Sequence, residues 1–133
     1  MKRNKKLMKN IAECPCTGKT LERLIHPAIL LILTDGPLYG YKIIQRLTET
    51  PMFKNKKPNT AGVYRCLKTM AAGKLVVASW KLSKSGPAKR LYTLTEQGEK
   101  CLASWIITLH GYHETVDELL ARAQKAIRRL RAS

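Results

Sequence analysis

Apolar residues recur at steps of three and four along several stretches of the chain, which is the spacing of one helix face. The segment from residue 60 up to Gly73 shows this pattern clearly and is expected to form a helix, with Asn59 or Thr60 as its N-cap and Gly73 as its C′ residue, the second residue past the last helical one. The predicted buried stripe consists of Val63, Cys66, Leu67 and Met70. Cys66 is therefore expected to be an inert core thiol.

Two shorter helices are expected before this one. Residues 28–33 are apolar on every side, which predicts a helix buried within the fold or against a second subunit. The Asp-Gly-Pro sequence at 35–37 supplies its stop signal. A second helix is expected over residues 41–48, because its apolar side chains fall at helical spacing: Ile43, Ile44 and Leu47.

The pattern then becomes that of two strands. Residues 75–82 and 90–95 are rich in β-branched and aromatic side chains, and the second run alternates in character from one residue to the next. Gly86 and Pro87 lie in the basic segment between them. The two runs are therefore expected to form an antiparallel hairpin.

The last segment, residues 96–133, carries an apolar stripe along its whole length, with Gly111 as the candidate position for a kink or break. A stripe this long needs a covering surface, and the same helix of a second chain is the simplest one. Packing against residues 28–33 of the same subunit is the alternative, and the two are compatible. The expected dimer contacts are Leu102, Trp105, Leu109, Tyr112, Val116 and Leu120.

The predicted fold class is mainly α with a small antiparallel β-hairpin, a winged helix-turn-helix followed by a long C-terminal dimerisation helix. We expect three parts: a basic, Cys-containing N-terminal arm (1–19), a winged-helix DNA-binding domain (20–95) and the dimerisation helix (96–133).

The net charge of the chain indicates which class of molecule it binds. The formal net charge is +16, from 25 Lys and Arg against 9 Asp and Glu, and nucleic acid is the default partner of so basic a domain. An anionic membrane surface would need a basic amphipathic helix with large apolar residues opposite, or a lipid anchor, and the most apolar run is too short to span a bilayer. With no secretory signal at the N-terminus, a cytoplasmic protein without membrane contact is expected.

The sequence contains few of the residue patterns that enzymes use for catalysis. Asp occurs only at Asp35 and Asp117, which leaves few members for a carboxylate pair, and the histidines form no metal-binding pattern. No catalytic site and no cofactor are expected.

The candidate DNA contacts lie on the third helix and on the hairpin. Tyr64, Arg65 and Lys68 lie mostly off the buried stripe and are expected to face the major groove, with Thr60 near a phosphate. Cations around a Gly-Pro turn are suited to phosphates, and glycine allows close approach. A surface hairpin with solubilising charges is the alternative. The full predicted set is Asn59, Thr60, Tyr64, Arg65, Lys68, Lys84, Gly86, Lys89 and Arg90.

Two further sites are considered. A small apolar or aromatic effector could lie between the dimer helices, against Ile29, Leu33, Trp105 and Leu109, although such an apolar set is also typical of a core. Cys14 and Cys16 are separated by one residue, which does not match Cys-x-x-Cys spacing. They are either plain thiols in a loop or a switch that responds to oxidation or to a metal. Basic neighbours would favour the switch, because they stabilise the thiolate, which is the reactive and metal-binding form.

Three blocks resemble the PadR-like transcriptional regulators: GPLYGYKI at 36–43, GVYRCLKTMAAGKLV at 62–76 and SGPAKRLYTLTEQG at 85–98. The resemblance implies a dimeric DNA-binding regulator, usually a repressor released by a ligand or stress signal, whose C-terminal helix makes the dimer. Family members often have Tyr-Pro where this chain has Tyr64-Arg65, so no base preference is carried over. A sequence-specific homodimeric repressor is expected. A nucleoid-associated or RNA-binding winged helix without sequence specificity is the alternative.

Overall fold

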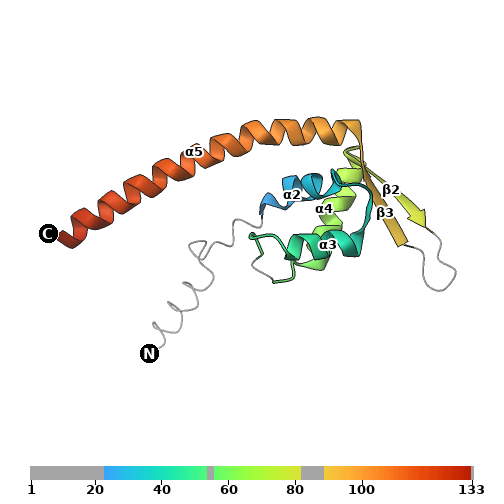
Figure 1. Ribbon diagram of the computed structural model, residues 1–133, viewed down its shortest axis with the longest axis horizontal. Coiled ribbons are helices and arrows are strands. Elements are labelled where there is room, and N and C mark those ends of the chain that lie inside the picture. Colours follow the sequence, from blue (N-terminus) through green and yellow to red (C-terminus); the bar gives the residue numbers. More distant parts are fainter. Residues whose placement is uncertain (1–22, 54–55, 82–88, 133) are drawn as a thin grey trace, which may run out of the picture.

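The computed structural model describes residues 23–53, 56–81 and 89–132 of the 133-residue chain. Figure 1 shows short helices gathered beside a small sheet, and a long helix that passes one of them and extends well beyond the other described elements. In chain order the elements are α2 (Ile25–Leu33), β1 (Leu38–Tyr39), α3 (Gly40–Thr48), α4 (Thr60–Ala72), β2 (Val76–Lys81), β3 (Lys89–Leu94) and α5 (Glu96–Ala132). The predicted fold class is confirmed.

The core lies where α2, α3 and α4 meet one face of the sheet. Most of the predicted α4 stripe is confirmed, since Val63, Leu67 and Met70 are buried, while Cys66 is half-buried. Helix α2 departs from the expectation of all-round burial at Leu31, which is 61% exposed. The side chains with almost no exposure are Ile29, Leu30, Ile43, Leu47, Val63, Leu67, Met70, Val76 and Tyr92.

The sheet is antiparallel and has three strands in the order β1-β3-β2. The expected hairpin is confirmed, and each of its strands differs by one residue at either end from the predicted range. The third strand, β1, was not predicted, because two residues are too few to show an alternating pattern. It pairs Leu38 with Tyr92 and Tyr39 with Leu91, which fixes the α2–α3 connection to the hairpin.

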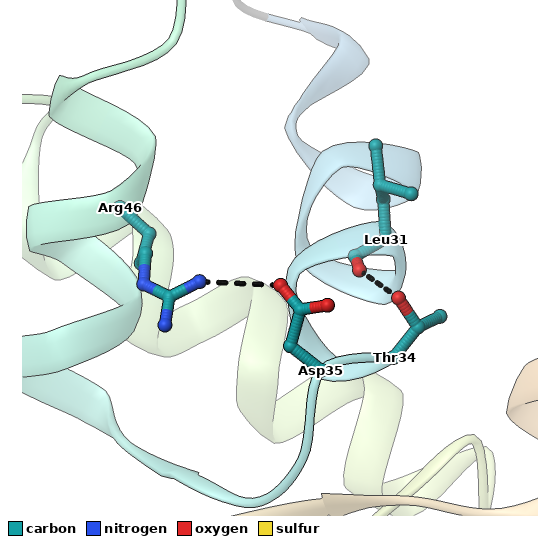
Figure 2. A network of polar contacts seen from close by, with 4 residues as sticks. All are labelled: Leu31, Thr34, Asp35 and Arg46. Carbon is teal, nitrogen blue, oxygen red and sulfur yellow. Dashed lines mark hydrogen bonds and ion pairs between the residues drawn. The ribbon is translucent and has the colours of Figure 1, made fainter.

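The α2–α3 connection contains the predicted helix stop (Figure 2). The Thr34 hydroxyl donates a hydrogen bond to the Leu31 carbonyl at 2.5 Å, and Gly36 has a φ of +131°, which a residue with a side chain rarely adopts. The Arg46 guanidinium lies 3.3 Å from the Asp35 carboxylate and links α3 to this turn. Both partners are largely exposed, so the ion pair contributes about 1 kcal/mol at most.

Both ends of α4 are closed by hydrogen bonds. At its start the Asn59 side chain accepts one from the Gly62 backbone N–H at 2.9 Å, as predicted for an N-cap. At its end Gly73 directly follows Ala72, but the expectation that it is the C′ residue is wrong by one position. Gly73 is the C-cap with φ −81°, and Lys74 adopts the left-handed conformation at φ +61°. The Leu75 N–H reaches the Met70 carbonyl, which completes a Schellman motif.

The junction of β3 and α5 explains the Thr-x-x-Gly sequence at 95–98. The Thr95 hydroxyl lies 2.7 Å from the Lys74 carbonyl and 2.9 Å from the Leu75 carbonyl, and it accepts a hydrogen bond from the Gly98 N–H. A Cβ on Gly98 would collide with the Leu75 carbonyl and with the Leu94 side chain. Only glycine therefore lets the first turn of α5 lie against the α4–β2 turn.

Helix α5 continues without interruption through Gly111, so the break considered there does not occur. Its first turns pack against α2 and the core through Cys101, Leu102 and Trp105, and its later part projects away from the other described elements (Figure 1). Across the described ranges, no helix is both long enough and apolar enough to cross a membrane.

Candidate nucleic-acid interface

The outer face of α4 carries three exposed side chains that can contact nucleic acid: Tyr64, Arg65 and Lys68. They lie away from the buried stripe, as predicted. Tyr64 packs on the first residue of α3, because a Cβ on Gly40 would lie 2.6 Å from Cε1 and 2.8 Å from Oη of the Tyr64 ring. The lack of a side chain at Gly40 therefore lets the two helices of the helix-turn-helix approach each other at this point.

The hairpin contributes two further cations, each held on an aromatic ring. The Arg90 guanidinium lies 4.9 Å from the centroid of the Trp80 ring, and the Lys89 ammonium lies 5.2 Å from that of Tyr41. Tyr41 in turn stacks on Tyr39, with ring centroids 5.9 Å apart and planes 7° from parallel. Such cation–π contacts restrict where long, flexible side chains place their charge.

These two sets of side chains line one open groove of about 670 Å³, which we call the α4–hairpin groove. Four cations line it, and no Asp or Glu is among its described lining residues. A concave surface with cations and aromatic rings, and without carboxylates, suits a polyanion. The lining residues are Tyr39, Gly40, Tyr41, Ala61, Tyr64, Arg65, Lys68, Trp80, Lys89, Arg90 and Tyr92.

The groove unites five of the residues predicted from the sequence: Tyr64, Arg65, Lys68, Lys89 and Arg90. The other predicted contacts are placed differently. Asn59 and Thr60 are exposed at the start of α4, where the Asn59 side-chain oxygen is engaged in the helix cap. Lys84 and Gly86 lie outside the described residues, as do Cys14 and Cys16.

Sequence reasoning missed the aromatic lining. Tyr39 and Tyr41 are visible in the sequence as a pair around Gly40, but their stacking depends on the turn from β1 into α3. Trp80 lies directly across the hairpin from Arg90. Which residues pair across the hairpin depends on the number of residues in its loop. The sequence alone leaves that number uncertain by one or two residues.

The residues considered for an effector lie where α2 meets α5. Ile29 and Leu33 are buried in the core, whereas Trp105 and Leu109 are half-buried. The Trp105 Nε1–H donates a hydrogen bond to His26 Nδ1 at 3.1 Å. An effector pocket formed by the four predicted residues stays a prediction.

The residues considered for a dimer follow α5 outward from the core. Leu102 is half-buried, whereas Tyr112, Val116 and Leu120 are 51–58% exposed. A dimer through them also stays a prediction.

The Cys66 thiol has the surroundings expected of an unreactive cysteine. It lies 3.8 Å from the Met70 sulfur, and burial raises the pKa of the Cys66 thiol from its ordinary value. Less thiolate is therefore present at neutral pH, which agrees with the predicted inert core thiol.

The fold and the groove define a winged-helix domain of the DNA-binding type. Within this class, the chain belongs to the PadR-like family of transcriptional regulators, whose family model matches residues 29–104, more than half of the chain. The family resemblance drawn from the three sequence blocks is thereby confirmed. A search of curated proteins found no match.

Several solved structures resemble the chain. A Thermoplasma acidophilum protein described as a transcriptional regulator is 26% identical, with a TM-score of 0.67 over 77% of this chain and 95% of its own. A PadR-like regulator from Bacillus cereus is 25% identical, with a TM-score of 0.61 over 75% of this chain and 94% of its own. Bacillus subtilis PadR, solved in complex with operator DNA, is 26% identical with a TM-score of 0.56. That match covers 64% of this chain and 48% of the Bacillus subtilis chain.

Proposed function

We propose that this PadR-family regulator is a homodimeric repressor that binds a specific operator in double-stranded DNA and is released by a small-molecule or stress signal in the cytoplasm. The observation that carries the proposal is the gathering of Arg65, Lys68, Lys89 and Arg90 around one groove, beside the exposed face of α4. The operator complex of the similar Bacillus subtilis PadR supports the choice of DNA as the partner.

Helix α4 would lie in the major groove. Tyr64, Arg65 and Lys68 would face the bases, with Thr60 near a phosphate at the start of the helix. Arginine can pair bidentately with guanine, which discriminates between bases by about 1–3 kcal/mol. On the hairpin side, Lys84, Lys89 and Arg90 would contact the DNA backbone, with Gly86 allowing close approach.

Helix α5 supports the proposed homodimer by its heptad pattern. From residue 102 to residue 130 the stripe advances in alternating steps of three and four, which is the spacing of a coiled-coil seam. Much of it faces solvent in the single chain, including Val116 at 58% and Leu119 at 62% exposure. The stripe consists of Leu102, Trp105, Leu109, Tyr112, Val116, Leu119, Ala123, Ala126 and Leu130.

In this proposal residues 96–133 act as the dimerisation helix, residues 20–95 as the DNA-binding domain and residues 1–19 as a basic arm. A two-fold dimer would place its two α4 helices about 34 Å apart and favour a pseudo-palindromic operator.

Release would act through the contact between α2 and α5. Ile29 and Leu33 are buried in the core and Trp105 packs against that core, so a small apolar effector that bound among the three would displace Trp105. Movement of Trp105 would break its hydrogen bond to His26 and shift α5 against the DNA-binding domain. The distance between the two α4 helices of the dimer would then change, and the operator would no longer fit.

Selection of bound fragments from the source genome, followed by competition with random DNA, tests the proposal. A specific repressor is expected to recover a few recurring sites and to prefer them over random DNA by a factor of about 10³ or more. Equal competition by random DNA, with the same strong salt dependence, would instead favour the nucleic-acid-binding module without sequence specificity.

A further inference from the structure

Trp80 has no assigned role, and its placement is unusual for so large a side chain. The chain has two tryptophans, and the side chain of this one is 61% exposed. In the hairpin register Trp80 pairs with Arg90, two positions along from the pair of Ala78 and Tyr92. Because side chains alternate along a strand, Trp80 and Arg90 share the sheet face that carries the buried Tyr92. That face continues past the core and becomes one wall of the α4–hairpin groove.

The contact between Trp80 and Arg90 holds the Arg90 guanidinium in place before it binds an anion. The Arg90 guanidinium lies 4.9 Å from the centroid of the Trp80 ring. Stacking on the indole removes much of the rotational freedom of a long side chain before it binds, while the guanidinium edge keeps its N–H donors free for an anion. Arg90 would therefore lose less entropy on meeting a phosphate than an unsupported surface arginine would.

The opposite wall of the groove is α4, with Arg65 and Lys68 on its exposed face. In a duplex, one sugar–phosphate strand separates the major groove from the neighbouring minor groove. A domain that places α4 in the major groove and its hairpin beside the next minor groove must therefore straddle that strand. The α4–hairpin groove is the space between these two parts, and its aromatic and cationic lining matches the apolar sugars and anionic phosphates of the strand.

We propose that the α4–hairpin groove seats this sugar–phosphate strand, and that Trp80 is the positioning residue that holds Arg90 against a phosphate while its ring packs on a deoxyribose. The proposal rests on the proposed function, because α4 must lie in the major groove for the strand to pass here. It adds a role for Trp80 that does not depend on base sequence.

The test uses the full-length protein and a random-sequence duplex, with affinity measured over a series of salt concentrations. Losing one phosphate contact lowers the slope of log affinity against log salt by about one unit. Arg90→Ala is expected to show this loss, and so is Trp80→Ala, although the latter removes no charge. The double variant is expected to lose no more than Arg90→Ala alone, and Trp80→Phe is expected to keep most of the wild-type slope. Val77→Ala, an exposed position on the other face of β2, serves as the control and should behave as wild type.

A wild-type salt slope in Trp80→Ala would overturn the proposal, and so would losses that add fully in the double variant. Thermal unfolding of each free protein shows whether a variant is folded. Should Trp80→Ala be unfolded, tryptophan emission decides: duplex binding is expected to quench emission in wild type and Trp105→Phe but much less in Trp80→Phe. Equal quenching in the two Phe variants would also overturn the proposal.

The same measurements separate this inference from the proposed function. If Arg65→Ala and Lys68→Ala leave the affinity for a selected operator as well as for the random duplex unchanged, α4 does not bind DNA and the proposed function fails together with this inference. If both weaken binding while Trp80→Ala retains wild-type affinity and salt slope, only the role of Trp80 fails.

Discussion

The indole N–H of Trp105 on α5 donates a hydrogen bond to His26 Nδ1 on α2, 3.1 Å away, and their ring centroids are 5.8 Å apart. The bond requires a neutral His26, because a protonated imidazole has no acceptor nitrogen. Burial acts in the same direction, since it lowers the pKa of His26 from its ordinary value of about 6.5. Docking of α5 on α2 therefore depends on the protonation state of one side chain.

We predict that this pair makes the folded state less stable as the pH falls. Below about pH 6.5 the unfolded chain takes up the proton first, so stability is lost until the lower folded-state pKa of His26 is passed. Melting temperature measured from pH 7.5 to pH 5 should fall more in wild type than in His26→Gln, which can still accept a hydrogen bond but does not titrate. His110→Gln, at an exposed position of α5, is the control and should follow wild type. Parallel curves for all three proteins would contradict the prediction.

Two glycines in α5 should respond to alanine with opposite sign. Gly98→Ala places a Cβ against the Leu75 carbonyl, and we expect it to lower the free energy of unfolding by about 1–3 kcal/mol. Gly111→Ala meets no atom within 4 Å and removes a flexible residue from a helix interior, so it should raise stability by about 0.5–1 kcal/mol. Denaturant unfolding of both variants measures the difference. Equal effects would mean that Gly98 is not needed for close approach.

Lys74→Gly should stabilise the protein. Lys74 adopts a φ of +61° after the end of α4, a conformation that costs a side-chain-bearing residue energy and that glycine adopts freely. We expect a gain of roughly 0.5–1 kcal/mol in denaturant unfolding. Lys74→Ala removes the same charge without relieving the backbone and should give no such gain. A similar gain in both variants would assign the effect to charge rather than to conformation.

The proposed dimer depends on the outer part of α5. Deleting residues 116–133 removes the exposed half of the stripe, and we expect a monomer or an aggregate with weak DNA binding. Light scattering and operator affinity measure the outcome. A finer comparison uses Leu119→Glu within the stripe and Ile107→Glu outside it, both at exposed apolar positions. A truncated chain that stays dimeric and binds fully would place the interface elsewhere.

Features that depend on local sequence were predictable. The stripe of Val63, Leu67 and Met70 located α4, and its start was narrowed to Asn59 or Thr60, because helix periodicity and N-capping involve only residues three or four apart. The stop at Gly36 was predictable for the same reason. The hairpin followed from two strand-like runs around a Gly-Pro turn.

Features that depend on distant contacts were not predictable. The left-handed residue is Lys74 rather than Gly73, because the position is set by where the turn into β2 meets the Thr95 side chain. The stacking of Trp80 under Arg90 requires the exact hairpin register. The exposed face of α4 was predictable, and its contact with DNA stays a proposal. Its aromatic surroundings come from β1, α3 and β2 and appear only in the fold.

Whether α4 reads a base sequence is measured by the affinity of Arg65→Ala for a selected operator and for random duplex DNA at the same salt concentration. We expect a loss of about 1–3 kcal/mol on the operator and a clearly smaller loss on random DNA. Arg122→Ala, which removes the same charge from an exposed position of α5, should leave the ratio of the two affinities unchanged. Equal losses on operator and random DNA for Arg65→Ala would reduce Arg65 to a phosphate contact and contradict sequence readout by this side chain.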